Sequence, residues 1–134
     1  MNTELYEEVH RLSVSIVNAS EKGLQDLESE AYSELERLCN RFEKSDSNHP
    51  IQWEALGDFA MNHEQALSAY RKGLACSEKL GLVEYQASIL FAMAECYLDQ
   101  GSIDQAAQFA LLAQQHAEEI DDEELKSAIG DFLK

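Results

Sequence analysis

Apolar side chains recur along this chain at intervals of three and four residues, the spacing that places them on one face of an α-helix. Two such stripes cover the first third of the sequence: Leu5, Val9, Leu12 and Ile16, then Leu24, Leu27, Ala31, Leu35, Leu38 and Phe42. They predict one helix from about Thr3 to Ala19 and a second that follows Gly23 and ends near Lys44. The strict alternation typical of strands occurs nowhere, so we expect an all-α fold.

Loop and cap residues divide the rest of the chain into further helices. Residues 45–50, Ser-Asp-Ser-Asn-His-Pro, are turn formers, and a proline is tolerated at the first position of a helix. This predicts a short helix from Pro50 to about Met61. Asn62 with Gln65 fits a capping box that opens a helix ending at Leu80, before Gly81.

The same signals predict three helices in the C-terminal part. One covers about Val83 to Gln100 and is ended by Gly101. Ser102 with Gln105 fits a second capping box, for a helix through about Ile120. Asp121 and Asp122 are expected to cap a last helix, over residues 122–133. We expect four of its side chains to face inward: Leu125, Ile129, Phe132 and Leu133.

Parts of the chain repeat each other. Glu64-Gln65-Ala66 matches Asp104-Gln105-Ala106, an offset of 40 residues from 66 to 106. Each segment also places two small residues seven apart, Ala66 with Gly73 and Ala106 with Ala113. We expect these small residues to let neighbouring helices pack closely. Ala31, Leu35 and Leu38 repeat the spacing more faintly.

The helix before each of these segments completes the pattern. Residues 53–57, Trp-Glu-Ala-Leu-Gly, resemble the W-x-x-L-G opening of a tetratricopeptide repeat, a helical hairpin of about 34 residues. The next copy matches the family at a further set of positions: Leu90, Met93, Ala94, Tyr97, Gly101, Ile103 and Ala106. The resemblance covers residues 51–120 and is to the longer variant of about 40 residues. The first copy departs from it, because the stretch from Gly57 to Ala66 is three residues short, and a tighter hairpin turn is expected there.

The resemblance implies an all-α, short α-solenoid of about three antiparallel helical hairpins plus a C-terminal capping helix. It makes residues 1–134 a single domain. The parts are a diverged helical pair over 3–44, repeats over 50–80 and 83–120, and the capping helix over 122–133. One hairpin cannot bury its own apolar face, so stacked hairpins would share a continuous core.

Charge limits the partners that this chain can have. It carries 26 acidic and 10 basic residues, a net charge of -16. Such a chain is repelled by phosphate backbones and anionic lipid, so we expect no nucleic acid and no membrane as partner. A basic partner would be attracted, although acidity also serves solubility alone. The N-terminus lacks the basic and then apolar pattern of a signal peptide, and we expect a cytoplasmic protein.

Motifs that carry chemistry are missing from the sequence. There is no glycine-rich phosphate loop and no nucleophile elbow. Cys39, Cys76 and Cys96 lie far apart and fit buried free thiols in a reducing compartment. Glu7-x-x-His10 has the spacing of a carboxylate-bridged metal site, but no matching second pair exists. We therefore expect no enzyme activity, no metal and no cofactor.

The resemblance also implies where a partner would bind, namely on a concave face lined by the first helix of each hairpin. Seven residues would line it: Glu54, Asp58, Ser88, Phe91, Glu95, Leu98 and Asp99. Carboxylates beside Phe91 and Leu98 suit a basic, amphipathic peptide or helix of another protein, bound by an adaptor or regulator. In the alternative interpretation Phe91 and Leu98 are core residues and the acids form a solvated face.

Other functions fit the same pattern. The chain could be a dedicated chaperone or a neutralising, immunity-type partner of one secreted protein or toxin. It could instead be a structural subunit that forms a homodimer, because three repeats are close to the minimum for stability. A third alternative is a mimic of nucleic acid that occupies a DNA-binding protein. Residues 3–44 could also fill the groove rather than extend it.

Overall fold

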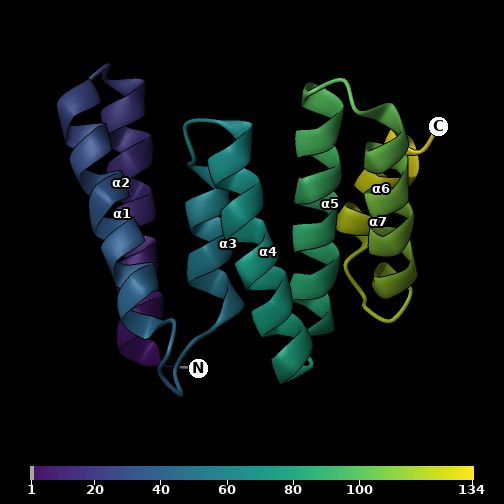
Figure 1. The fold of residues 1–134 in the computed structure, drawn as a ribbon, viewed down its shortest axis with the longest axis horizontal. Coiled ribbons are helices and arrows are strands. Elements are labelled where there is room, and N and C mark those ends of the chain that lie inside the picture. Colours follow the sequence, from purple (N-terminus) through teal and green to yellow (C-terminus); the bar gives the residue numbers. More distant parts are fainter. Residues whose placement is uncertain (1) are drawn as a thin grey trace.

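The computed structural model describes residues 2–134, and these residues form seven α-helices. In chain order the helices are α1 (Thr3–Glu21), α2 (Gln25–Phe42), α3 (Pro50–Asp58), α4 (His63–Leu80), α5 (Val83–Asp99), α6 (Ile103–Ala117) and α7 (Glu123–Phe132) (Figure 1). No strand occurs within residues 2–134, which confirms the expected all-α class. None of the helices in this range is long and apolar enough to cross a bilayer.

Several helix ends form as their cap residues predict. The Asn62 side chain accepts a hydrogen bond from the Gln65 backbone N–H, 2.9 Å away, at the start of α4. Asp122 accepts one from Leu125 in the same way at the start of α7, also at 2.9 Å. Gly81 ends α4 in the left-handed conformation at φ 68°. The capping box at Ser102 was a wrong prediction, because its side chain makes no capping hydrogen bond.

The first repeat is shorter because its first helix, α3, is shorter, and not because its turn is tighter. Helix α3 ends at Asp58, directly after Gly57, and therefore does not reach the expected Met61. Helix α5, by contrast, continues to Asp99, more than one turn past Ala94. Residues 59–62 connect α3 to α4, a connection no shorter than residues 100–102 between α5 and α6. The expectation of a tighter turn was therefore wrong.

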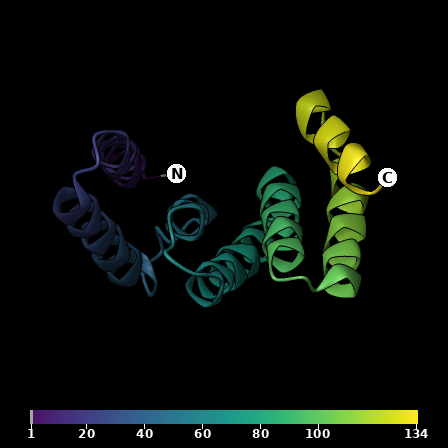
Figure 2. The same cartoon turned by 90° about the horizontal axis from the view of Figure 1, so that it is seen from above.

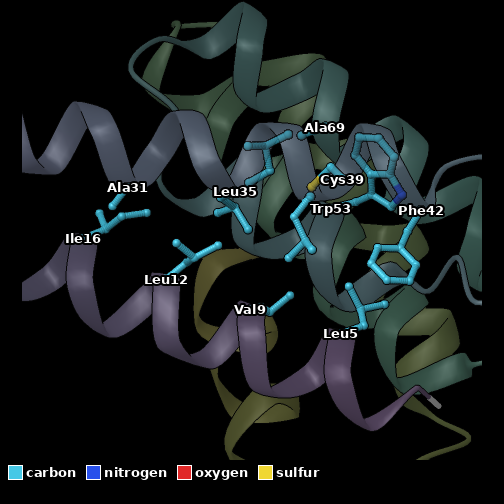
Figure 3. Close-up of a cluster of buried hydrophobic side chains, with 12 residues drawn as sticks. Leu5, Val9, Leu12, Ile16, Ala31, Leu35, Cys39, Phe42, Trp53 and Ala69 are labelled. Atoms are coloured by element: carbon cyan, nitrogen blue, oxygen red, sulfur yellow. The ribbon is translucent and has the colours of Figure 1, made fainter.

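Each helix packs mainly on its neighbours in sequence. Successive helices are in contact from α1 to α7, and α3 additionally touches both α1 and α5. The buried side chains form three clusters, and the second and third share the half-buried residues Leu74 and Phe109. In the first cluster Leu12 of α1 lies opposite Leu35 of α2 and Leu5 opposite Phe42, and Trp53 of α3 also belongs to it (Figure 3).

Small residues set the closest approach of two helices. A Cβ atom on Gly73 of α4 would lie 3.0 Å from Trp53 Cβ and 3.1 Å from Ile89 Cδ1. Ala106 and Ala113 of α6 are likewise buried. Close packing at Gly73 was expected from its place in the repeat.

Two members of the second predicted stripe are not buried. Leu24 is 44% exposed and Leu27 is 54% exposed. At about 1.5 Å per residue, α3 is roughly half the length of α2. Because α3 starts near the end of α2, it stops before it reaches the tip of the first hairpin. The tip therefore has no third helix to cover its apolar side chains.

Candidate functional site

The odd-numbered helices lie on one side of the molecule. Figure 2 shows α1, α3, α5 and α7 along one side and α2, α4 and α6 along the other. The row of helices bends, so that α1 and α7 lie nearer the top of Figure 2 than α3 and α5 do. We call the side formed by the odd-numbered helices the concave side.

Basic residues are unevenly distributed among the helices. Helices α3 and α5 contain no lysine or arginine and carry five acids: Glu54, Asp58, Glu84, Glu95 and Asp99. Helices α2 and α4, on the opposite side, carry seven acids together with five bases: Arg37, Arg41, Arg71, Lys72 and Lys79. The middle of the concave side is therefore more acidic than the average of the chain, and a cation approaching it meets no like charge from α3 or α5.

Glu54 and Ser88 join α3 to α5. The Ser88 hydroxyl donates a hydrogen bond of 2.6 Å to Glu54 Oε2, and both residues are half-buried. Burial raises the pKa of the Glu54 carboxyl, the hydrogen bond from Ser88 partly opposes the rise, and the nearby charge of Asp58 adds to it. The structure thus brings these two sequence-predicted residues into direct contact.

Asp58, Glu95 and Asp99 border one hollow. Its volume is about 610 Å³, and it lies where α3 ends beside α5, with Gly57 and Ala92 among its walls. Asp58 also accepts a hydrogen bond of 2.6 Å from the Tyr70 hydroxyl. Three predicted residues from two different helices therefore converge on the same surface feature.

Asp58 and Glu95 are less well solvated than isolated surface acids. Burial raises the pKa of Asp58, and the hydrogen bond from Tyr70 acts in the opposite direction. Burial likewise raises the pKa of Glu95, with smaller contributions from the charges of Asp99 and Asp58. All three nevertheless remain in contact with water. A bound cation would relieve the mutual repulsion of these carboxylates.

The two apolar residues predicted for the face differ in their surroundings. Phe91 is half-buried and packs edge-to-face on Phe132 of α7, with ring centroids 5.4 Å apart and an interplanar angle of 81°. Leu98 is 47% exposed and is therefore not a core residue. The alternative interpretation, in which both are core residues, therefore fits Phe91 better than Leu98.

Sequence reasoning missed the aromatic residues at the other end of this side. The ring of His49 meets Tyr85 edge-on, with centroids 5.1 Å apart. Burial and then the charge of Glu54 raise the pKa of Tyr85, and Tyr6 of α1 lies close enough to add to the effect. Tyr6 itself is 48% exposed. The helical stripe of α1 identified its buried face, but nothing in the sequence marked the exposed Tyr6 as part of this side.

A second surface feature lies between α2 and α4. Two adjoining hollows share Trp53 and Lys72, and Lys44 and Lys79 border one of them. The Lys72 ammonium lies 5.0 Å from the centre of the Trp53 ring and forms an ion pair of 3.3 Å with Glu43. Trp53 is only 2% exposed, so it serves as the floor of this groove and not as a free platform.

The reactive side chains of the described region are not arranged for catalysis by a thiol. Cys39, Cys76 and Cys96 are all buried and free. Burial raises the pKa of Cys39 to about 12 and raises those of Cys76 and Cys96, which disfavours the thiolate. Within residues 2–134 no three His, Cys, Asp or Glu side chains are placed to hold a metal ion.

Comparison of the chain with protein-family models, with curated proteins and with solved structures finds no match. The interpretation of the concave side therefore depends on its own geometry and charge.

Proposed function

We propose that this protein is a non-catalytic protein–protein interaction module whose concave side binds a basic or amphipathic segment of a partner protein. The absence of bases from α3 and α5 is the observation that carries this function. Acids alone occupy α3 and α5, whereas α2 and α4 carry bases as well as acids. Acidity that served solubility alone would not require bases to be absent from these two helices.

We further propose that the seven helices form a short α-solenoid similar to tetratricopeptide repeats, with three antiparallel hairpins and α7 as a capping helix. Two observations support this description. Successive helices are in contact, and α3 bridges α1 and α5, as the first helices of stacked hairpins do. Close packing at Gly73 against Trp53 occurs where the repeat pattern places a small residue.

Lysine or arginine side chains of the partner would supply the counter-charge that α3 and α5 lack. Glu54, Asp58 and Glu95 are partly desolvated, so a cation near them interacts more strongly than it would with acids in bulk water. The complementary charges would steer the encounter, and apolar contacts would supply much of the affinity.

An affinity capture with two charge-matched variants tests the function. Glu95→Lys/Asp99→Lys reverses two charges on the concave side, and Glu64→Lys/Glu78→Lys reverses two exposed charges on α4. Substitution of Phe91 is avoided, because its ring packs on Phe132. We expect one dominant basic protein to be retained by the wild type and the α4 variant and to be lost with the α5 variant. Equal retention by both variants would exclude the concave side as the binding site.

A homo-oligomeric structural role is the second candidate, and α6 is the observation that favours it. This helix has no charged residue between Asp104 and His116, and Leu111 and Leu112 are 50% and 41% exposed. An uncharged surface is where two chains of net charge -16 could approach each other. Light scattering after size-exclusion chromatography tests this role on the wild type and on Leu111→Glu/Leu112→Glu. A wild-type dimer that the substitutions dissociate would support it, and a monomeric wild type would exclude it.

A further inference from the structure

We infer that the occupant of the concave side is an amphipathic α-helix of the partner, whose apolar strip lies along α1 and whose basic strip faces α3 and α5. This inference rests on the proposed protein-binding function and adds to it the conformation of the partner and a role for α1. The residues that assign that role, Tyr6, Val14 and Val17, are absent from the sequence-predicted site.

The first observation is an exposed apolar strip on α1. Tyr6, Val14 and Val17 are 48%, 44% and 41% exposed, and the helical repeat places them on one side of α1 with His10 between them. None of these four residues is a carboxylate or is bound in an ion pair within the described chain.

The second observation is the direction in which this strip faces. Helix α1 stands on the concave side and packs on both α2 and α3 (Figure 2), and the helical repeat places the strip on the flank of α1 away from α2. The other flank of α1 faces α2, where Arg11 forms an ion pair with Glu34 at 3.3 Å. The buried face of α1, with Leu5 and Leu12, is already used by the core. The strip is therefore a third face of α1, without a partner in the chain.

The shape of the strip favours a helix over an extended peptide. From Tyr6 to Val17 it runs for about 16 Å along the α1 axis, at 1.5 Å per residue. Its apolar side chains recur at helical intervals, which a second helix packed lengthwise can match with its own i, i+3 and i+4 side chains. An extended peptide that crossed α1, α3 and α5 would touch the strip at one place only.

Charge complementarity fixes how such a helix would be oriented about its own axis. The strip on α1 is apolar, and the neighbouring α3 and α5 carry Glu54, Asp58, Glu95 and Asp99 without any base. A helix with its apolar side chains on α1 would direct the adjacent face at these acids. Lysine or arginine on that face would be attracted, and acidic residues there would be repelled.

Two synthetic peptides of identical composition provide the probe. Both contain 18 residues, half leucine and half lysine, and only one has an order that separates the two types on opposite faces of a helix. We expect the amphipathic order to bind the full-length wild-type protein at least about tenfold more tightly than the scrambled order in 0.1 M salt, because only it can bury a continuous apolar strip. Amide shifts in the protein's NMR spectrum should change along residues 6–17 and on α3 and α5.

Two apolar-to-polar variants then locate the contact. Val14→Gln/Val17→Gln removes apolar surface from α1 without adding charge or breaking the helix. Leu111→Gln/Leu112→Gln makes the equivalent change on α6, which lies on the opposite side. We expect the α1 variant to bind the amphipathic peptide about tenfold more weakly and the α6 variant to bind it unchanged. Circular dichroism verifies that each variant is folded.

The outcomes separate this inference from the function beneath it. In one outcome Glu95→Lys/Asp99→Lys abolishes binding, but the α1 variant binds the amphipathic peptide as tightly as the wild type does, and the wild type binds the scrambled peptide equally well. The concave side then binds cations, but the proposed helix along α1 is wrong. If neither the α1 nor the α5 variant weakens binding, both the inference and the proposed site are wrong. Peptide binding too weak to measure at 1 mM overturns the inference, whatever the capture experiment retains.

Discussion

The ring of Tyr70 lies directly against Gly57, and the Tyr70 hydroxyl donates a hydrogen bond of 2.6 Å to Asp58 Oδ1. One side chain of α4 is thus held by two consecutive residues at the end of α3. Because Asp58 also borders the acidic hollow, packing at Gly57 helps to position a candidate binding residue.

Gly57→Ala should destabilise the protein although alanine favours helices. A Cβ atom at this position would collide with the buried Tyr70 ring, which its hydrogen bond to Asp58 keeps in place. Overpacking of about 1–3 kcal/mol outweighs a gain in helix propensity of about 1 kcal/mol. Gly130→Ala is the matched control, because Gly130 of α7 has nothing within 4 Å of a Cβ atom and should gain up to about 1 kcal/mol. Urea unfolding measures both, and equal effects would refute the steric argument.

Asn48→Ala should cost more than Gln52→Met. Asn48 Oδ1 accepts two hydrogen bonds, from Trp53 Nε1 at 2.9 Å and from Gln52 Nε2 at 2.6 Å. Alanine leaves both donors without a partner, a loss of about 2–4 kcal/mol in the free energy of unfolding. Gln52 Oε1 is buried without a hydrogen-bond partner in the described structure, so methionine removes an unsatisfied acceptor together with one donor. We expect that change to stay within about 1 kcal/mol. Thermal or urea unfolding of both variants decides the order.

Glu54→Gln should stabilise the protein at pH 7, and the gain should shrink as the pH falls. Burial raises the pKa of Glu54 in the folded state, so the folded protein binds its proton more tightly than the unfolded chain. In the wild type, the contribution of Glu54 to the free energy of unfolding is present at low pH and is lost as the pH rises through the raised pKa. Burial lowers the pKa of His49, which has the opposite effect and is common to both proteins. Urea unfolding of wild type and variant from pH 7 to pH 4 tests the difference, and a constant difference would contradict the assigned shift.

Cys39 should resist alkylation while the protein is folded. Its side chain is fully buried, its thiol donates to the Gln52 carbonyl oxygen at 3.3 Å, and burial raises its pKa to about 12. At pH 8 almost no thiolate forms and the reagent has no access. Mass spectrometry after iodoacetamide treatment should find Cys39 unmodified, with a urea-unfolded sample as the positive control. Rapid labelling without urea would show that the first core cluster opens readily.

Much of the candidate face could be located from the sequence, because side chains on one helix keep a fixed angular relation. Trp53, Leu56 and Gly57 are buried as the repeat pattern requires, and the opposite face of α3 therefore carries Glu54 and Asp58. Their function in binding stays a prediction. The Phe91–Phe132 contact could not be foreseen, since the position of α7 across α5 depends on the path of the chain after α6.

The sequence by itself determined the helices, because apolar spacing and cap residues act within a few neighbouring positions. Asn62 and Asp122 cap the first turns of α4 and α7, and Gly81 ends α4, as local chemistry requires. Only the tertiary structure decided which faces meet. It ended α3 at Asp58, left Leu27 uncovered at the hairpin tip, and packed Phe132 of α7 on Phe91 of α5. These outcomes depend on how far one helix extends beside another, and no local pattern encodes that distance.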